Sequence, residues 1–275
     1  MKIKFLGTAA AEGCPGVFCN CEYCSEARHL GGKNIRTRSQ TLINDDLLID
    51  LPADTYSHFL CNGIEGDKIA NLLITHNHGD HFYPEELQHR GVPYAHNMRV
   101  PMLDVFCGEK VYQELEGFLD DCTEVSVHQL KPFEEVNVGN YRVTPLTARH
   151  NPANGGGLIY IIREDDKTIL YAHDTGYFFD EVFEYIENNK IFFDFVTLDC
   201  TCVNIPTSDN DVHMGIENNL RLVKKLKEIG AVNDKTIKVI NHFSHNGGPI
   251  QHKLENQVGK HGFLVAYDGF TVEIE

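Results

Sequence analysis

The pattern of hydrophobic and polar positions along the chain predicts short strands first and alternating helices and strands later. Short apolar runs predict strands at residues 2–6, 40–44, 47–51, 71–75, 124–130, 141–146, 158–163, 167–172, 195–198 and 237–241. Helical periodicity predicts helices near residues 53–60, 109–119, 181–188, 215–228 and 251–258. Residues 263–275 contain two short apolar runs around a glycine turn and predict a terminal hairpin.

These elements predict an α/β protein in which two sheets pack together and helices cover the outside. Both halves of the chain contain several consecutive strands followed by alternating helices and strands. No segment is rich in Pro and Ser, no sequence repeat is visible and no long block of charge marks a linker. We therefore expect residues 1–275 to form a single domain.

The net charge and the lengths of the apolar runs indicate which kinds of molecule this protein can bind. The 275 residues include 24 Lys and Arg against 40 Asp and Glu, so the net charge is -16. Such a chain repels the phosphate backbone of long nucleic acids, which favours a small substrate over DNA or RNA. The apolar runs are far shorter than the roughly 20 residues that cross a bilayer, and the N-terminus lacks a signal-like apolar stretch. We expect a cytoplasmic protein that contacts no membrane.

The clearest chemical signal is the segment THNHGDH, from Thr75 to His81, which directly follows a predicted buried strand. It places four potential metal ligands, His76, His78, Asp80 and His81, within six residues. Neutral imidazoles and carboxylates suit zinc, manganese or iron. These four ligands are more than one ion needs if water must also bind to it, so the spacing predicts two metals.

The second signal is a cluster of thiols. The chain has 9 cysteines, an odd number that favours metal binding or free thiols over a disulfide framework. Three of them, Cys19, Cys21 and Cys24, lie within six residues in a loop that contains Gly and Pro. A tetrahedral structural zinc needs a fourth ligand. Cys14 and His245 are both candidates, and the spacing alone does not choose between them.

The THNHGDH segment resembles the HxHxDH signature of the metallo-β-lactamase superfamily. This resemblance implies a four-layer αββα sandwich with a dinuclear metal site along one edge of the two sheets. It also implies that later loops complete the site. Carried over to this sequence, one metal is held by His76, His78 and His150, the other by Asp80, His81 and His242, and Asp174 bridges the two. We expect zinc or manganese at both positions.

Two further aspartates are expected to support these ligands. Asp50 matches a position at which the superfamily has an aspartate that accepts an N–H from a ligand imidazole. Here it is followed by Leu51 and Pro52, where the superfamily usually has a pair of small residues. Asp199, at the end of a predicted strand, is placed to orient one of the site histidines.

A longer set of motifs resembles the PhnP-type phosphodiesterases, which hydrolyse cyclic ribose phosphates in the bacterial C–P lyase pathway. The motifs are Gly7-Thr8, Gly13-x-Pro15, the cysteine cluster, Arg36-x-Arg38, Leu198-Asp199-Cys200, the histidine pair His242 and His245, and Tyr267-Asp268-Gly269. They span the chain from Gly7 to Gly269, apart from roughly residues 82–125.

The PhnP-type resemblance also implies roles for two histidines. In that group the three cysteines and the second histidine of the final pair bind a structural zinc, which implies His245 and not Cys14 as the fourth ligand here. His213 matches a histidine that lies beside the metal pair without ligating it. Such a residue could donate a proton to the leaving oxygen or bind the phosphoryl oxygens.

Together these features favour a metal-dependent phosphodiesterase that cleaves a small cyclic or activated phosphodiester. In this hypothesis a hydroxide held by two metals attacks phosphorus, with Asp80 and His213 as catalytic residues. One alternative is another hydrolase of the superfamily, such as an RNA-processing nuclease, a lactonase or a thioesterase; another is a non-catalytic, PqqB-like metal-binding accessory protein. The presence of all seven ligands favours turnover. A homodimer is left open, and specificity is expected to come from residues 82–125 and 151–157.

Overall fold

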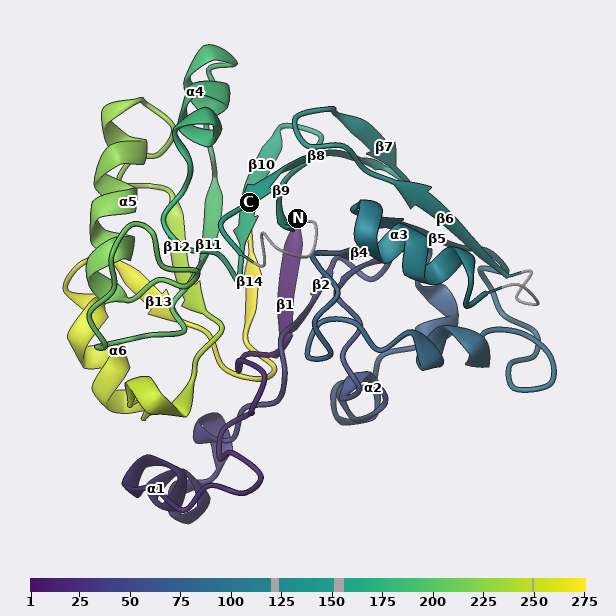
Figure 1. Cartoon of the computed structure of the whole chain (residues 1–275), viewed down its shortest axis with the longest axis horizontal. Helices are drawn as coiled ribbons and strands as arrows, with labels where there is room; N and C mark the ends of the chain where they lie inside the picture. The colour runs from purple at the N-terminus through teal and green to yellow at the C-terminus, as the bar shows by residue number, and fades with distance from the viewer. Residues whose placement is uncertain (120–123, 151–155, 249) are drawn as a thin grey trace.

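Two seven-stranded sheets lie at the centre of the computed structural model, which describes residues 1–119, 124–150, 156–248 and 250–275 (Figure 1). In spatial order the first sheet contains β14 (Thr271–Glu273), β1 (Lys2–Gly7), β2 (Gln40–Ile43), β3 (Leu47–Ile49), β4 (Asn71–Ile74), β5 (Leu103–Cys107) and β6 (Val125–Gln129). The second contains β13 (Phe263–Val265), β12 (Ile237–Asn241), β11 (Phe195–Asp199), β10 (Lys167–Ala172), β9 (Gly157–Glu164), β8 (Tyr141–Ala148) and β7 (Val136–Val138).

Helices cover the outer face of each sheet (Figure 1). The first sheet is covered by α2 (Thr55–Asn62) and α3 (Glu109–Glu116), and the second by α4 (Asp180–Asn188), α5 (Ile216–Glu228) and α6 (Gln251–Gly259). The four-layer αββα arrangement expected from the sequence is confirmed. A further helix, α1 (Glu22–Leu30), lies apart from both sheets at the lower end of the view. None of the helices in the described ranges is long and apolar enough to cross a membrane.

The strands are apolar on both faces because each face of each sheet is covered. In β3, Leu47 and Ile49 pack between the two sheets, whereas Leu48 packs under the helices of the first sheet. In β9, Tyr160 lies between the sheets and Ile161 packs under the helices of the second. Successive side chains of a strand point to opposite faces, so a continuous apolar run is what a doubly covered strand requires.

The prediction of a terminal hairpin at residues 263–275 is wrong. β13 pairs in parallel with β12, whereas β14 pairs antiparallel with β1 in the other sheet. The chain crosses between the sheets here, and Asp268 fixes the crossing by accepting hydrogen bonds from the Thr8 hydroxyl and the Thr37 backbone N–H, each at 2.7 Å. The hydrophobic pattern of a short strand indicates its buried face and does not identify its partner, so it fits either pairing.

Among the described α-helices and strands, α1, β5 and β7 were not predicted from the sequence, and neither were the short 3-10 helices. The first turn of α1 lies inside the cysteine cluster, where Cys21 caps the helix by accepting a hydrogen bond from the Cys24 backbone N–H. Thiols are uncommon capping groups, so the usual capping signal was missing. β5 falls in the segment 82–125, and β7 is only three residues long.

Candidate metal centre

The predicted metal ligands follow strands that end along one edge of the two sheets. Residues 76–81 follow β4 in the first sheet, and His150, Asp174 and His242 follow β8, β10 and β12 in the second. β10, β11 and β12 are parallel neighbours, and β8 runs in the same direction because β9 is antiparallel to both of its neighbours. The carboxyl ends of these strands therefore meet at one edge, which is where α/β proteins form their binding sites.

The seven predicted ligands form two groups that share one carboxylate. The first group consists of His76, His78, His150 and Asp174, whose ligand atoms lie within 4.8 Å of one another. The second consists of Asp80, His81, Asp174 and His242, with the same spread of ligand atoms. This grouping coincides with the one carried over from the superfamily signature. The binding of metal by these residues stays a prediction.

The distances between ligand atoms suit one small cation in each group. His78 Nδ1 lies 3.0 Å from His76 Nε2 and 3.1 Å from His150 Nε2. In the other group, His81 Nε2 lies 3.1 Å from His242 Nε2. Ligand atoms about 2.0–2.1 Å from a tetrahedral ion are about 3.3 Å from one another. The imidazole nitrogens are therefore spaced as in a coordination shell.

Asp174 connects the two groups. Its Oδ2 lies 3.0 Å from His76 Nε2 and 3.2 Å from His81 Nε2, so it contacts one histidine of each group. Its Oδ1 is buried and lies 3.0 Å from His213 Nδ1 and 3.3 Å from His150 Nδ1. Burial opposes ionisation, yet the surrounding histidines hold the pKa of Asp174 well below its usual range. A buried carboxylate is costly unless positive charge offsets its own, so Asp174, which lies among histidines of both groups, fits a shared divalent ion.

Three site residues have a left-handed backbone that side chains other than glycine rarely adopt. Asp50, Asp174 and His242 have φ values of 65°, 52° and 65°. All three follow strand ends at the same edge of the molecule. Such conformations cost free energy, and in native structures they concentrate at functional sites. The strained positions here coincide with the candidate metal centre.

Asp50 lies where the superfamily resemblance implies, despite the unusual Leu51 and Pro52 that follow it. Its Oδ2 is 2.7 Å from His81 Nδ1, which donates its proton to the carboxylate and leaves the Nε2 lone pair directed at the second group. Its Oδ1 accepts the Thr75 backbone N–H at 2.8 Å and the Thr75 hydroxyl at 2.9 Å. Asp50 therefore holds both a ligand and the start of the ligand-bearing loop.

His213 lies against Asp174 and is partly exposed, with 26% of its side chain accessible. Its Nδ1 is 3.0 Å from Asp174 Oδ1 and 3.4 Å from Asp199 Oδ2. Burial opposes protonation, yet these two carboxylates outweigh it and raise the pKa of His213 to about 10. Asp199 Oδ2 is also 3.5 Å from His242 Nδ1, so this aspartate contacts two site histidines. His213 is close enough to the centre to act either as a proton donor or as an additional ligand.

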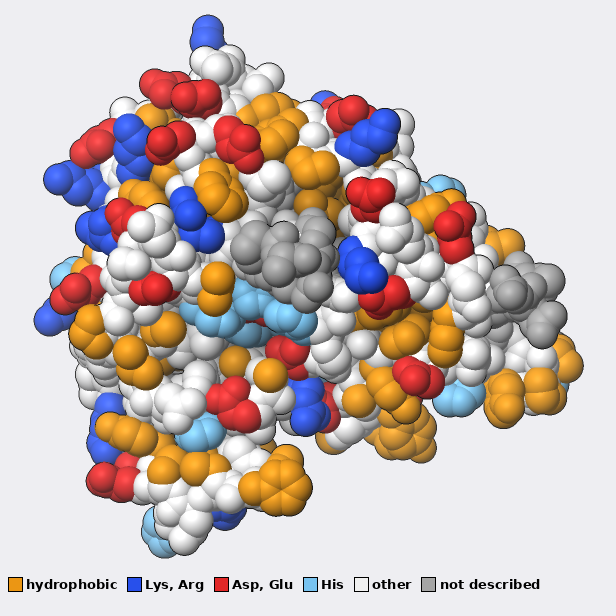
Figure 2. All heavy atoms as spheres, viewed as in Figure 1, with side chains coloured by type: hydrophobic (Ala, Val, Ile, Leu, Met, Phe, Trp, Pro, Cys, Tyr) orange, Lys and Arg blue, Asp and Glu red, His pale blue; other side chains and the backbone are white. Residues whose placement is uncertain are grey.

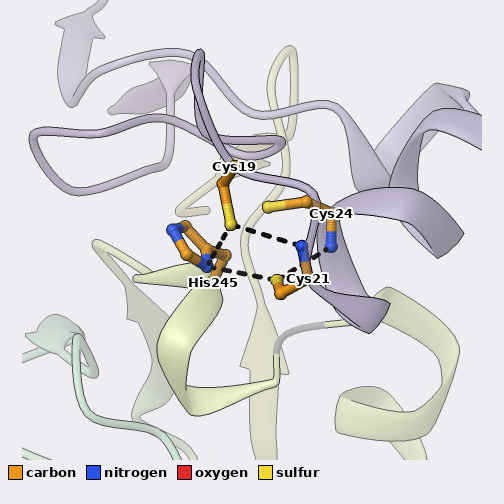
Figure 3. A group of neighbouring side chains, drawn as sticks. All are labelled: Cys19, Cys21, Cys24 and His245. Atoms are coloured by element: carbon orange, nitrogen blue, oxygen red, sulfur yellow. Dashed lines mark hydrogen bonds between the residues drawn. The ribbon is translucent and has the colours of Figure 1, made fainter.

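The cysteine cluster forms a separate group with His245 (Figure 3). His245 Nδ1 lies 3.9 Å from Cys19 Sγ and 3.6 Å from Cys21 Sγ. Backbone N–H groups point at the sulfurs, with Gly16 donating to Cys24 Sγ at 3.3 Å and Cys24 donating to Cys21 Sγ at 3.4 Å. This last hydrogen bond lowers the pKa of Cys21 to about 6 and so favours the thiolate that zinc binds.

Cys14, the other candidate for the fourth position, lies outside this group of ligand atoms. It is buried against Ala27 and Ile250. The geometry therefore favours His245, as the PhnP-type resemblance implies.

A short segment after β12 reaches both the metal centre and the cysteine cluster. His242 belongs to the former, and His245, the first residue of η5 (His245–Gly247), belongs to the latter. Between them the Phe243 backbone N–H donates to the Thr8 carbonyl at 2.9 Å, and the Arg36 guanidinium lies 4.4 Å from the centre of the Phe243 ring. The segment is thereby fixed against the loop that follows β1.

The metal centre reaches the surface. Figure 2 shows histidine side chains gathered near the middle of one face, and both His78 and His213 are half-buried. A cavity of about 160 Å³ adjoins His76, and Lys110 and Lys131 contribute to its lining. Lys110 belongs to residues 82–125, where specificity was expected to originate. The other segment expected to contribute, 151–157, falls mostly outside the described residues.

Sequence reasoning missed two threonines at the centre. Thr75 Oγ1 lies 3.0 Å from His76 Nδ1, and Thr201 Oγ1 lies 2.8 Å from His242 Nδ1. Thr75 directly precedes the predicted ligand His76, a signal that could have found it, whereas no predicted site residue is adjacent to Thr201 in the sequence. The contact between Thr201 and His242 joins residues on different loops, so the sequence alone does not indicate it.

Comparisons with known proteins identify the family of this chain. The family described as "Beta-lactamase superfamily domain" matches residues 53–243, more than half of the chain. The chain is 24% identical to coenzyme PQQ synthesis protein B from Acinetobacter baumannii (strain SDF), with 100% of both chains covered.

Three solved structures share the fold. A diphosphatase from the PhnP family has a TM-score of 0.75 at 20% identity, with 99% of this chain and 97% of that chain covered. Zn(2+)-bound PqqB from Methylobacterium extorquens has a TM-score of 0.75 at 16% identity, with 99% and 100% covered. The short form of human tRNase Z has a TM-score of 0.67 at 15% identity, with 100% of each chain covered. The family match covers residues 53–243, and the αββα fold with ligand candidates clustered at one edge of the sheets is consistent with it. The chain therefore belongs to the β-lactamase superfamily.

Proposed function

We propose that this protein is a metal-dependent phosphodiesterase that acts on a small cyclic or activated phosphodiester. The proposal depends above all on two groups of ligand atoms that share Asp174, with His213 beside them. Two divalent ions held in this way supply a nucleophile at neutral pH and offset negative charge on phosphoryl oxygens. The ions are zinc or manganese, and a third, structural zinc binds the cysteine cluster.

The side chains around the metal groups have separate tasks in this proposal. Asp80 and Asp174 provide the negative charge that allows two cations to bind close together. His213, half-buried and open to solvent on one side, donates a proton to the leaving oxygen. Lys131 and Lys110, which line the cavity that adjoins His76 together with Glu109, are placed to contact an anionic substrate there.

The net charge of the chain and the volume of the cavity beside His76 both favour a small substrate. The net charge of -16 opposes the binding of long nucleic acids, although the fold is shared with tRNase Z. The cavity beside His76, at about 160 Å³, is of the size that a small organic group occupies. A mononucleotide or a sugar phosphate diester suits this site better than folded RNA.

A second candidate function is a part in the synthesis of coenzyme PQQ. It is favoured by the match to coenzyme PQQ synthesis protein B, which covers all of both chains. Under this reading the metals hold the fold and bind a ligand without phosphodiester turnover. The two candidates differ in whether the purified protein hydrolyses phosphodiesters.

The test is a substrate panel assayed with the metal-loaded protein: a model aryl diester, 2′,3′-cyclic nucleotides, a ribose 1,2-cyclic phosphate and a precursor tRNA. We expect turnover of at least one small diester and none of the tRNA. Asp80→Ala is the matched control, since it removes one ligand and should abolish the same activity. Hydrolysis of the tRNA alone, or of none of the panel, would overturn the proposal, and the second outcome would favour the PQQ-related reading.

A further inference from the structure

Thr201 stands between an aspartate and a metal-ligand candidate in the interior of the protein. Its hydroxyl donates to Asp199 Oδ2 at 2.8 Å and lies 2.8 Å from His242 Nδ1. A threonine hydroxyl has one proton, and that proton is committed to the carboxylate. Toward His242 the oxygen can therefore only accept, which requires the proton of His242 to be on Nδ1. The lone pair of Nε2 is then free and directed at the second ligand group.

Asp199 is held so firmly that it fixes the orientation of the threonine. It is fully buried, and its Oδ1 accepts the backbone N–H groups of Thr201 at 3.1 Å and Met214 at 2.9 Å. The Thr201 carbonyl in turn accepts the Ser244 backbone N–H at 3.2 Å, two residues after His242. The threonine is thus attached to the aspartate and to the loop that carries the histidine. Neither partner can move without breaking one of these hydrogen bonds.

The same arrangement occurs a second time, on the other sheet. Thr75 donates its hydroxyl proton to Asp50 Oδ1 at 2.9 Å and lies 3.0 Å from His76 Nδ1. By the same argument His76 is protonated on Nδ1, and its Nε2 faces His78 in the first ligand group. At two separate places, each built from two loops, an aspartate, a threonine and a histidine are therefore in contact in the same order. This repetition argues that the hydroxyl has a task beyond packing.

We propose that Thr201 is a positioning residue that sets the tautomer and ring orientation of His242, and with them the affinity of the metal position formed by Asp80, His81, Asp174 and His242. Groups that fix the far nitrogen of a ligand imidazole typically change metal affinity by 10- to 100-fold when they are removed. The inference rests on the metal-binding part of the proposed function and is independent of phosphodiester turnover.

The test compares three variants by zinc titration of the metal-free protein in competition with a chromogenic chelator. Thr201→Val keeps the shape of the side chain and removes the hydroxyl; we expect one zinc equivalent to bind roughly 10- to 100-fold more weakly. Thr201→Ser keeps the hydroxyl and should restore the affinity. Thr197→Val is the matched control, because it removes a buried hydroxyl that lies 2.6 Å from Nε2 of His173, outside the ligand groups. It should leave all zinc affinities unchanged.

Several outcomes would overturn the proposal. Unchanged zinc affinities in Thr201→Val would do so, as would an equal loss in Thr197→Val, which would indicate general destabilisation. If Thr201→Val does not fold, the nitrogen resonances of His242 in the zinc-loaded wild-type protein decide: protonated Nδ1 with zinc on Nε2 supports the proposal, and zinc on Nδ1 overturns it. A protein that binds zinc as expected and hydrolyses no diester contradicts the proposed function and leaves this inference intact.

Discussion

Asp174 is the carboxylate that both ligand groups share, so its loss should affect both metals at once. Asp174→Ala removes one ligand from each ion and also the negative charge that reduces repulsion between two cations. We expect this variant to retain neither metal of the centre and to lose measurable phosphodiester turnover. Metal analysis of the purified variant and a rate assay check this. Asp166→Ala, in an exposed turn, is the matched control and should change neither quantity. Normal turnover by Asp174→Ala would contradict a dinuclear mechanism.

His213 is expected to matter for the leaving group more than for the metals. If it protonates the leaving oxygen, His213→Ala should retain both metals and slow hydrolysis by roughly 10²- to 10⁴-fold. An aryl leaving group is a weak base and scarcely needs that proton, so the defect should be smaller for aryl than for alkyl diesters. The measurement is the ratio of kcat/KM for the two classes in wild type and variant. An equal defect on both, or lost metal, would identify His213 as a phosphate-binding residue or a ligand.

Among single residues, the metal-ligand candidates could be predicted because they occur in a distinctive order along the chain. Residues 76–81 carry a dense signature, and His150, Asp174 and His242 follow strand ends in the expected order. Thr201 is different, because its role depends on where its hydroxyl proton points and on a histidine from another loop. Threonine at a strand end is common, so composition and spacing do not distinguish this residue from its neighbours.

Among the elements, α1 depends on the cysteine cluster at its N-terminus. Cys21→Ser should lose one zinc equivalent, because serine is a poor zinc ligand and Cys14 lies outside the group of ligand atoms. Structural zinc contributes directly to folding free energy, so we expect the melting temperature to fall by more than about 2–4 °C, the change that 1 kcal/mol produces in a large domain. Metal analysis and a thermal melt measure the two effects.

The control for this prediction is Cys61→Ser, which makes the same chemical change at an exposed position of α2. It should alter neither the zinc content nor the melting temperature. If Cys21→Ser behaved like Cys61→Ser, the cysteine cluster would be a set of free thiols, and the assignment of a structural zinc would be wrong.

Most strands and helices could be predicted because their apolar residues follow a clear period. β9 and β10, for example, are long and apolar, and they lie close to their predicted positions. The pairing of short strands could not be predicted in the same way. β13 and β14 are three residues each, and their separation into different sheets depends on contacts such as Asp268 with Thr8, which join residues at opposite ends of the chain.

For the whole molecule, a chelator should remove metals in a defined order. The two groups that share Asp174 supply imidazole and carboxylate ligands, whereas the cysteine cluster supplies three thiols and an imidazole, a closed set of four that suits structural zinc. We therefore expect dialysis against a chelator to abolish activity first, with one zinc equivalent and most of the thermal stability retained. Adding zinc or manganese should restore turnover. Simultaneous loss of all metal and of the fold would show that the two kinds of site are not separable.

His242 and His245 are separated by only two residues, so the length of this segment fixes the distance between two metal sites. One ligand belongs to the centre and the other to the cysteine cluster, only three positions further on. Consecutive Cα atoms are about 3.8 Å apart, so one inserted residue displaces a ligand by more than the radius of a coordination shell. A glycine inserted between Phe243 and Ser244 should therefore cost one of the two kinds of metal. The same insertion between Asp165 and Asp166, in the exposed turn after β9, should cost neither, as metal analysis of the two proteins would establish. We therefore expect the spacing of His242 and His245 to tolerate no insertion, whereas an exposed turn such as residues 165–166 tolerates one.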